Sequence, residues 1–91
     1  MIFEWDEAKS ARNARERGLP FEIAAALFDG PVLESPDGRR DYGEARVKAV
    51  GMVNRVVMVC VYTDRGDVRR IISLRVANRK ERDGYRAAYP G

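Results

Sequence analysis

The residues of this chain that could do chemistry are mainly arginines in two neighbouring segments. Arg69, Arg70 and Arg75 stand within an otherwise apolar run, RRIISLR, and Arg46 and Lys48 alternate with small apolar residues in the segment before it. A guanidinium group binds phosphate in a bidentate way, and it is costly to cover unless it has an anionic partner. The pattern therefore indicates either a phosphate-binding patch or a set of internal ion pairs.

Successive side chains of a strand point to opposite faces, and this alternation divides the arginines of the second segment. It predicts Arg70 on one face with Ile72 and Leu74, and it predicts Arg69 and Arg75 together on the other face. Each face then combines arginine with aliphatic side chains. For any single arginine, an exposed or ion-paired role remains open beside a role in binding.

The two segments together predict a basic patch. Arg46 and Lys48 share a face of the first segment, so neighbouring strands would add one or two further arginines, with Lys9 at the edge. Such a patch would bind an RNA backbone and stabilise the charge of a pentacovalent phosphorane. Glu44 is the carboxylate beside it. It either accepts the proton of a ribose 2′-hydroxyl or forms a salt bridge with Arg46 or Arg70.

Single-stranded RNA also favours an aromatic surface on which bases stack. Tyr42, Tyr62 and Trp5 are the candidates, although core packing is the stronger interpretation for Trp5 and Tyr62. Cys60 lies inside the apolar run VVMVCVY, where a cysteine behaves as a small core residue.

The composition excludes several classes of enzyme. The 91 residues contain no histidine and one cysteine. A Ser-His-Asp or Cys-His hydrolase is therefore excluded, and a structural zinc site is unexpected. We expect no metal and no cofactor, and the length predicts one domain over residues 1–91.

The charges are distributed unevenly along the chain. Residues 1–45 hold six bases and ten acids, whereas residues 46–91 hold eleven bases and four acids. This asymmetry indicates two different partners, one of them polyanionic, or else an ordinary solvated surface. The N-terminus is acidic where a signal peptide is basic, and the longest apolar run is far shorter than a membrane helix. We therefore expect a cytoplasmic protein without membrane contact.

The elements that position these residues follow from caps and periodicity. Asp6 and Gly18 predict the ends of a first helix, and Pro20 begins a second helix that ends before residues 29–31. A short edge strand at residues 32–33 and strands at 44–53, 56–62 and 68–76 follow. Asn78 and Glu81 form a capping box for a last helix to about Tyr89. The sequence predicts an α+β fold with two N-terminal helices, a four-stranded mostly antiparallel sheet and a C-terminal helix.

The ordered set of motifs resembles one known family, the BrnT toxins. The opening FEWDEAKSARNARERG resembles F-E-W-D-x-x-K-x-x-x-N-x-x-x-x-G. The G-E-x-R motif of that family resembles Tyr42-Gly43-Glu44 with Arg46. Its R-I-I-S-x-R-x-A motif resembles RIIS with Arg75 and Ala77. Family members often carry Lys-His-Gly where this chain has Glu16-Arg17-Gly18.

The resemblance implies a RelE-like endoribonuclease, the toxin of a type II toxin–antitoxin system, which cuts RNA without a metal and arrests growth. It implies a BrnA-like antitoxin as partner, with operator DNA bound only through the antitoxin. The alternatives are a non-catalytic module that binds nucleic acid or a protein, and an inert fold whose bases pair with its own acids. The residues that carry the proposed site are Lys9, Glu44, Arg46 and Arg70 for catalysis, and Lys48, Arg69 and Arg75 for RNA binding.

Overall fold

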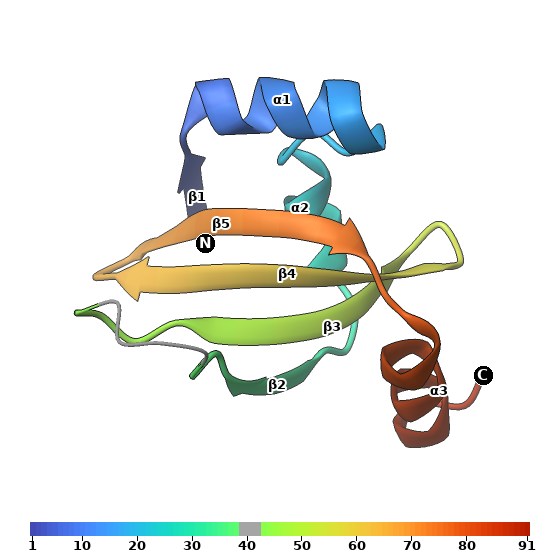
Figure 1. The fold of residues 1–91 in the computed structure, drawn as a ribbon. Coiled ribbons are helices and arrows are strands. Elements are labelled where there is room, and N and C mark those ends of the chain that lie inside the picture. Colours follow the sequence, from blue (N-terminus) through green and yellow to red (C-terminus); the bar gives the residue numbers. More distant parts are fainter. Residues whose placement is uncertain (39–42) are drawn as a thin grey trace.

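A mixed β-sheet with helices on both faces forms the body of the protein (Figure 1). The structure is a computed structural model that describes residues 1–38 and 43–91. The α+β class predicted from the sequence is confirmed. Among the described helices, none combines the length and apolar character that crossing a membrane requires. The elements are β1 (Ile2–Trp5), α1 (Glu7–Arg17), α2 (Ile23–Leu27), β2 (Leu33–Pro36), β3 (Val47–Val53), β4 (Val56–Arg65), β5 (Val68–Val76) and α3 (Arg79–Ala88).

The sheet has one strand more than the sequence predicted. Its order is β1-β5-β4-β3-β2, and β2 to β5 pair antiparallel. The additional strand β1 pairs in parallel with β5, with Ile2 opposite Val68 and Trp5 opposite Ile71. The prediction of four strands was therefore wrong, because a parallel partner this distant in sequence leaves no local turn signal. The connection through α1 and α2 carries the chain from one edge of the sheet to the other.

The helix ends largely follow their predicted caps. The Asp6 carboxylate accepts hydrogen bonds from the amides of Ala8 and Lys9, and Gly18 adopts a left-handed conformation with φ of 70°. The capping box of Asn78 and Glu81 is also present. The second helix is shorter than predicted, since Pro20 precedes a turn and the helix covers only residues 23–27.

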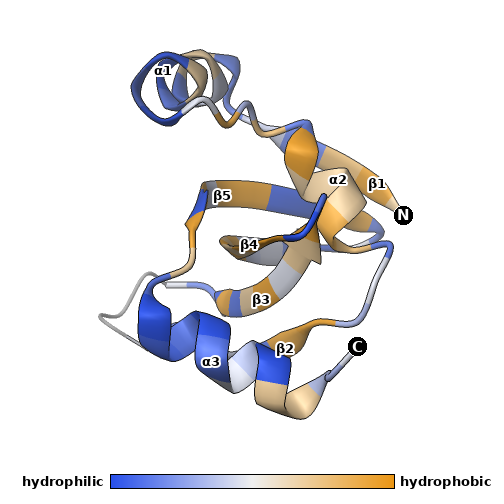
Figure 2. Cartoon of the chain, turned by 90° about the vertical axis from the view of Figure 1, so that its right-hand side faces the viewer, coloured by the Kyte–Doolittle hydropathy of each residue, from blue (hydrophilic) through white to orange (hydrophobic). Residues whose placement is uncertain are grey.

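Two apolar clusters fill the two faces of the sheet (Figure 2). On the α2 face, Ala24 and Leu27 pack against side chains of the central strands, among them Cys60, whose burial raises its pKa to about 12. On the opposite face, which we call the α3 face, Tyr85 packs against Val59 and neighbouring valines. Helix α3 covers only one end of its face (Figure 1), and no other described helix lies over the rest of that face.

A bulge in β5 decides which side chains reach which face. Between Val61 and Tyr62 of β4 the register shifts, and Ile72 has no partner in that strand. As a result Ile71 and Leu74, which are 2% and 1% exposed, belong to the same cluster on the α2 face. The prediction of strict alternation, which placed Leu74 opposite to Ile71, was therefore wrong from this point of the strand onward.

Helix α1 lies along the β1–β5 edge and is attached by polar contacts (Figure 1). The Asn13 amide donates to the carbonyls of Leu19 (2.6 Å) and Leu74 (2.9 Å), which ties the helix to β5. The buried Ser10 hydroxyl accepts the Phe21 amide (2.9 Å). These bonds hold the turn between α1 and α2 in place.

Gly51 marks the closest approach of β3 to α2, and its replacement by alanine should destabilise the fold. A Cβ atom there would lie 2.8 Å from Cγ of the buried Leu27. We expect Gly51→Ala to lower the free energy of unfolding by about 1–3 kcal/mol through overpacking. Gly84→Ala, at an open position of α3, should raise it by about 0.5–1 kcal/mol. Urea unfolding of both variants tests this, and equal stabilities would contradict it.

Candidate functional site

The open part of the α3 face forms a groove lined by basic and hydroxyl side chains. Lys48 comes from β3 and Arg75 from β5, on either side of the central strand β4. Val59 and Val61 of β4 form an apolar floor between them, and the groove has a volume of about 290 Å³. We call this the basic groove, and the residues that line it are Ser35, Pro36, Asp37, Gly38, Lys48, Val59, Val61, Ser73 and Arg75.

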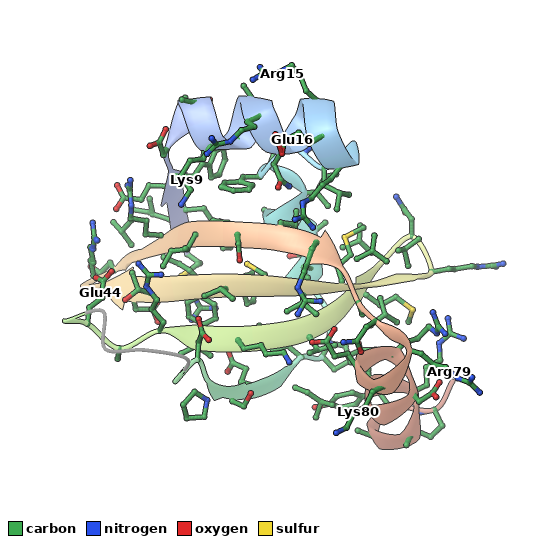
Figure 3. The ribbon with its side chains drawn as sticks, in the orientation of Figure 1. Lys9, Arg15, Glu16, Glu44, Arg79 and Lys80 are labelled. Atoms are coloured by element: carbon green, nitrogen blue, oxygen red, sulfur yellow. The ribbon has the colours of Figure 1, made fainter. Side chains whose placement is uncertain are left out.

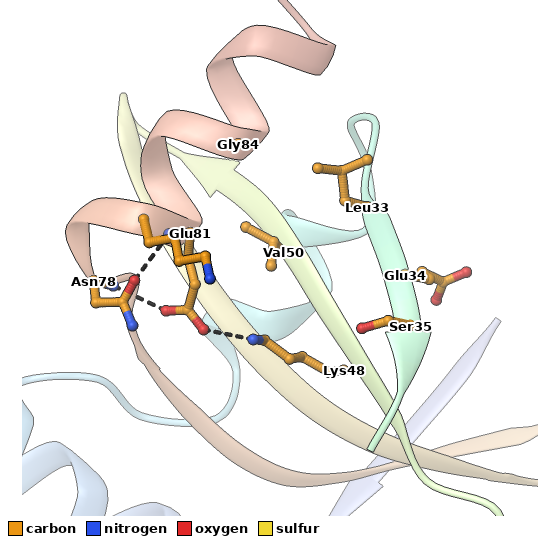
Figure 4. A pocket seen from close by; sticks show the side chains of 9 residues that line it. Leu33, Glu34, Ser35, Lys48, Val50, Asn78, Glu81 and Gly84 are labelled. Atoms are coloured by element: carbon orange, nitrogen blue, oxygen red, sulfur yellow. Dashed lines mark hydrogen bonds and ion pairs between the residues drawn. The ribbon is translucent and has the colours of Figure 1, made fainter. Parts of the chain in front are cut away.

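One carboxylate, Glu81 at the start of α3, binds both cations of the basic groove. Figure 4 shows its contacts with Lys48 and Asn78. Arg75 binds it in a bidentate way, with NH1 2.8 Å from Oε1 and NH2 2.9 Å from Oε2. The Lys48 ammonium lies 2.7 Å from Oε2, and the Asn78 amide donates to Oε1 at 2.9 Å. The helix cap and the cation pair therefore share the same two oxygen atoms.

These contacts fix the charge state of Glu81. The hydrogen bonds from Arg75 contribute most to lowering its pKa far below the usual value; those from Lys48 and the Asn78 amide also lower it, against the opposing effect of burial. Two cations share the carboxylate of Glu81, and a second carboxylate, that of Asp37, also lines the groove.

The bulge brings Arg70 to the α3 face. Arg70 lies opposite Thr63 of β4, two residues beyond the groove floor at Val61. Its guanidinium is 3.6 Å from the Glu4 carboxylate on β1. Arg70 and Arg75 therefore share a face, although the sequence predicted them on opposite faces.

A second shared carboxylate, Glu44, lies just before β3, at the end of the sheet remote from α3 (Figure 3). Its Oε2 is 3.2 Å from NH2 of Arg65, and its Oε1 is 3.9 Å from NH2 of Arg46. The Arg46 carbonyl accepts the amide of Asp37, which adjoins the basic groove. Of the two partners that the sequence offered Glu44, the structure shows Arg46.

Arg69 lies on the α2 face, away from the basic groove. Its guanidinium stacks 3.9 Å from the ring centroid of Tyr62 and 4.7 Å from that of Phe28. It also forms a bidentate pair with Asp64 at 2.9 and 3.1 Å, and this hydrogen bonding lowers the pKa of Asp64. These contacts are those of a residue that stabilises the α2 face, and they separate Arg69 from Arg75.

Lys9 lies on α1, and its side chain extends from the helix toward β1 (Figure 3). It is not among the residues that line the basic groove. The structure therefore brings Lys48, Arg70 and Arg75 to one face, and it leaves Lys9 on the neighbouring helix.

Neither of the two described candidates for base stacking, Tyr62 and Trp5, lines the basic groove. Tyr62 is buried on the α2 face, and its hydroxyl donates to the Glu34 carboxylate. Trp5 packs against the same cluster, and Tyr42 lies outside the described residues. Sequence reasoning missed Ser73 and Glu81 as site residues. The capping box identified Glu81, but it explains only the bond to the Asn78 amide.

Comparison with known families identifies one match, which covers most of the chain. The model of the ribonuclease toxin BrnT of type II toxin–antitoxin systems matches residues 5–81. No curated protein matches the chain significantly.

The ion cluster around Glu81 should make stability depend on pH. Its pKa in the folded state lies below the ordinary value of 4.5, so its stabilising contribution is present above that pH and is lost as the pH falls toward the folded pKa. We expect the free energy of unfolding to fall between about pH 5 and 3. Glu81→Gln should show a shallower fall than the parent, whereas Asp83→Asn, at an exposed carboxylate of the same helix, should follow the parent. Urea titrations at several pH values measure this; identical slopes for all three proteins would contradict it.

Proposed function

The chain belongs to the BrnT family of ribonuclease toxins of type II toxin–antitoxin systems, and on this basis we propose that its basic groove binds and cleaves RNA without a metal ion. The observation that carries the proposal is the convergence of Lys48 and Arg75 from two strands onto one carboxylate. Cations that converge on a carboxylate are also arranged to bind two oxygens of a phosphate. The open α3 face leaves room for a single strand of RNA, in keeping with the RelE-like fold that we infer.

The proposed reaction is an attack by the ribose 2′-hydroxyl on the adjacent phosphorus. A bond forms between O2′ and phosphorus, the bond from phosphorus to the 5′ oxygen breaks, and the products are a 2′,3′-cyclic phosphate and a 5′-hydroxyl. The 2′-hydroxyl loses a proton and the leaving oxygen gains one. Lys48 and Arg75 stabilise the extra negative charge of the phosphorane, which is an electrostatic form of catalysis.

The other basic residues extend this surface for the RNA backbone. In this proposal Arg70, on the same face of β5, and Arg46, beyond the groove at Asp37, bind flanking phosphates. Glu44, at the end of the sheet remote from α3, and Lys9, on α1, do not line the groove, so in this proposal water accepts the proton of the 2′-hydroxyl. Arg69 has no part in it, because its stacking and its pair with Asp64 lie on the α2 face.

A type II toxin is paired with an antitoxin protein. We propose a BrnA-like antitoxin whose acidic side chains cover the basic groove, so that RNA and antitoxin compete for the same cations. Operator DNA would then be bound through the antitoxin, and the complex would act in the cytoplasm.

Cleavage of a labelled single-stranded RNA in the presence of EDTA tests the proposal. Lys48→Ala and Arg75→Ala should each lower kcat/KM by about tenfold to a thousandfold, since each removes a charge that faces the phosphorane. Arg79→Ala is the matched control, because Arg79 is 87% exposed on α3 and should leave cleavage unchanged.

The products distinguish the two functions that the sequence left open. A 2′,3′-cyclic phosphate end supports the ribonuclease. Tight binding of RNA by the parent without any cut product would instead identify a non-catalytic binding module. Loss of activity on adding EDTA would overturn the metal-independent mechanism.

A further inference from the structure

Glu81 makes more contacts than its place in the helix cap requires. Capping requires one oxygen to accept the Asn78 amide, and an uncharged amide oxygen would serve for that bond. The carboxylate also binds Lys48 through Oε2 and Arg75 through both oxygens, and its side chain is only 10% exposed. Its charge and both oxygens are therefore used toward the cations of the basic groove.

We propose that Glu81 is the positioning residue of the ribonuclease site, which holds Lys48 and Arg75 in the arrangement that receives the phosphate; this rests on the proposed function. Lysine and arginine side chains have many rotamers, so ordering them costs conformational entropy. In this fold the ordering is completed before RNA arrives, because one rigid carboxylate fixes both groups. Catalysis gains from such preorganisation without further rearrangement of the site.

The charge of Glu81 acts against simple RNA binding. A carboxylate beside the backbone of a polyanion repels it, and its removal would make the net charge of the groove more positive by one. A surface that only attracted RNA would bind it better without Glu81. Binding and turnover should therefore respond to the loss of this charge in opposite directions, which separates positioning from a general contribution to the fold.

Glu81→Gln tests this inference, since glutamine has the same shape and retains an oxygen for the Asn78 amide. We expect kcat for cleavage to fall by about tenfold or more, because the two cations are no longer fixed. We expect the affinity for a 2′-O-methyl oligoribonucleotide, which cannot be cut, to stay equal or to increase, with a steeper dependence on salt. A variant that only loosened the fold would lose affinity and turnover together.

Two control variants separate charge and capping from positioning. Asp83→Asn removes an exposed negative charge from the same helix, and Asn78→Ala removes the side-chain cap of α3 without touching Lys48 or Arg75. Both should keep the kcat of the parent, although Asn78→Ala should melt at a lower temperature because α3 loses its cap. If Glu81→Gln does not fold, Glu81→Asp keeps the charge but is one methylene shorter, and it should lower kcat without increasing affinity.

The inference is overturned if Glu81→Gln keeps the parental kcat, if it cleaves faster, or if kcat and affinity fall in parallel with its melting temperature. A failure of the proposed function looks different. In that case neither the parent nor Asp83→Asn cuts RNA, and both proposals fall together.

Discussion

The carboxylate of Glu81 joins three elements, which are α3, β3 and β5. It caps α3 through the Asn78 amide, and through Lys48 and Arg75 it binds β3 and β5 on either side of the central strand. Helix α3 covers only one end of its sheet face, through an apolar cluster with Tyr85. The ion cluster therefore lies at the boundary between the part of the sheet that α3 covers and the basic groove. An interaction of this kind is strong only because every oxygen lone pair has a donor, which offsets the cost of burying the charge.

The bulge in β5 is the second determinant of the site. Arg70 and Arg75 are an odd number of residues apart, so a regular strand would have pointed them to opposite faces. The extra residue Ile72 brings them to the same face and leaves Arg69 on the other, over the rings of Tyr62 and Phe28. The same step lets Ile71 and Leu74 both enter the core. One bulged residue thus allows aliphatic side chains to pack on the α2 face and places two arginines together on the α3 face.

The sequence predicted the features that depend on neighbouring residues, which are the helix ends and the central strands. Asp6, Gly18 and the pair of Asn78 and Glu81 marked helix ends correctly, and the β-branched runs marked the central strands. Prediction from the sequence failed where contacts between distant segments determine the structure. Strand β1 forms only because β5 offers its edge, and no periodic pattern reveals the bulge. The basic patch was predicted as a set, but the choice of Arg70 over Arg69, and the role of Glu81 as a shared partner, depend on strand register.

The parallel pairing of β1 with β5 has a consequence for how the molecule is made. Residues 2–5 are the first of the described strands to be synthesised, yet their partners are residues 68–71. On the ribosome this segment must wait, unpaired, until most of the chain has been translated, and such long-range pairing forms slowly. Arg70, Ser73 and Arg75 belong to the same late strand. Because Lys48, Arg75 and Glu81 come from β3, β5 and α3, their ion cluster can assemble only after most of the chain has been synthesised.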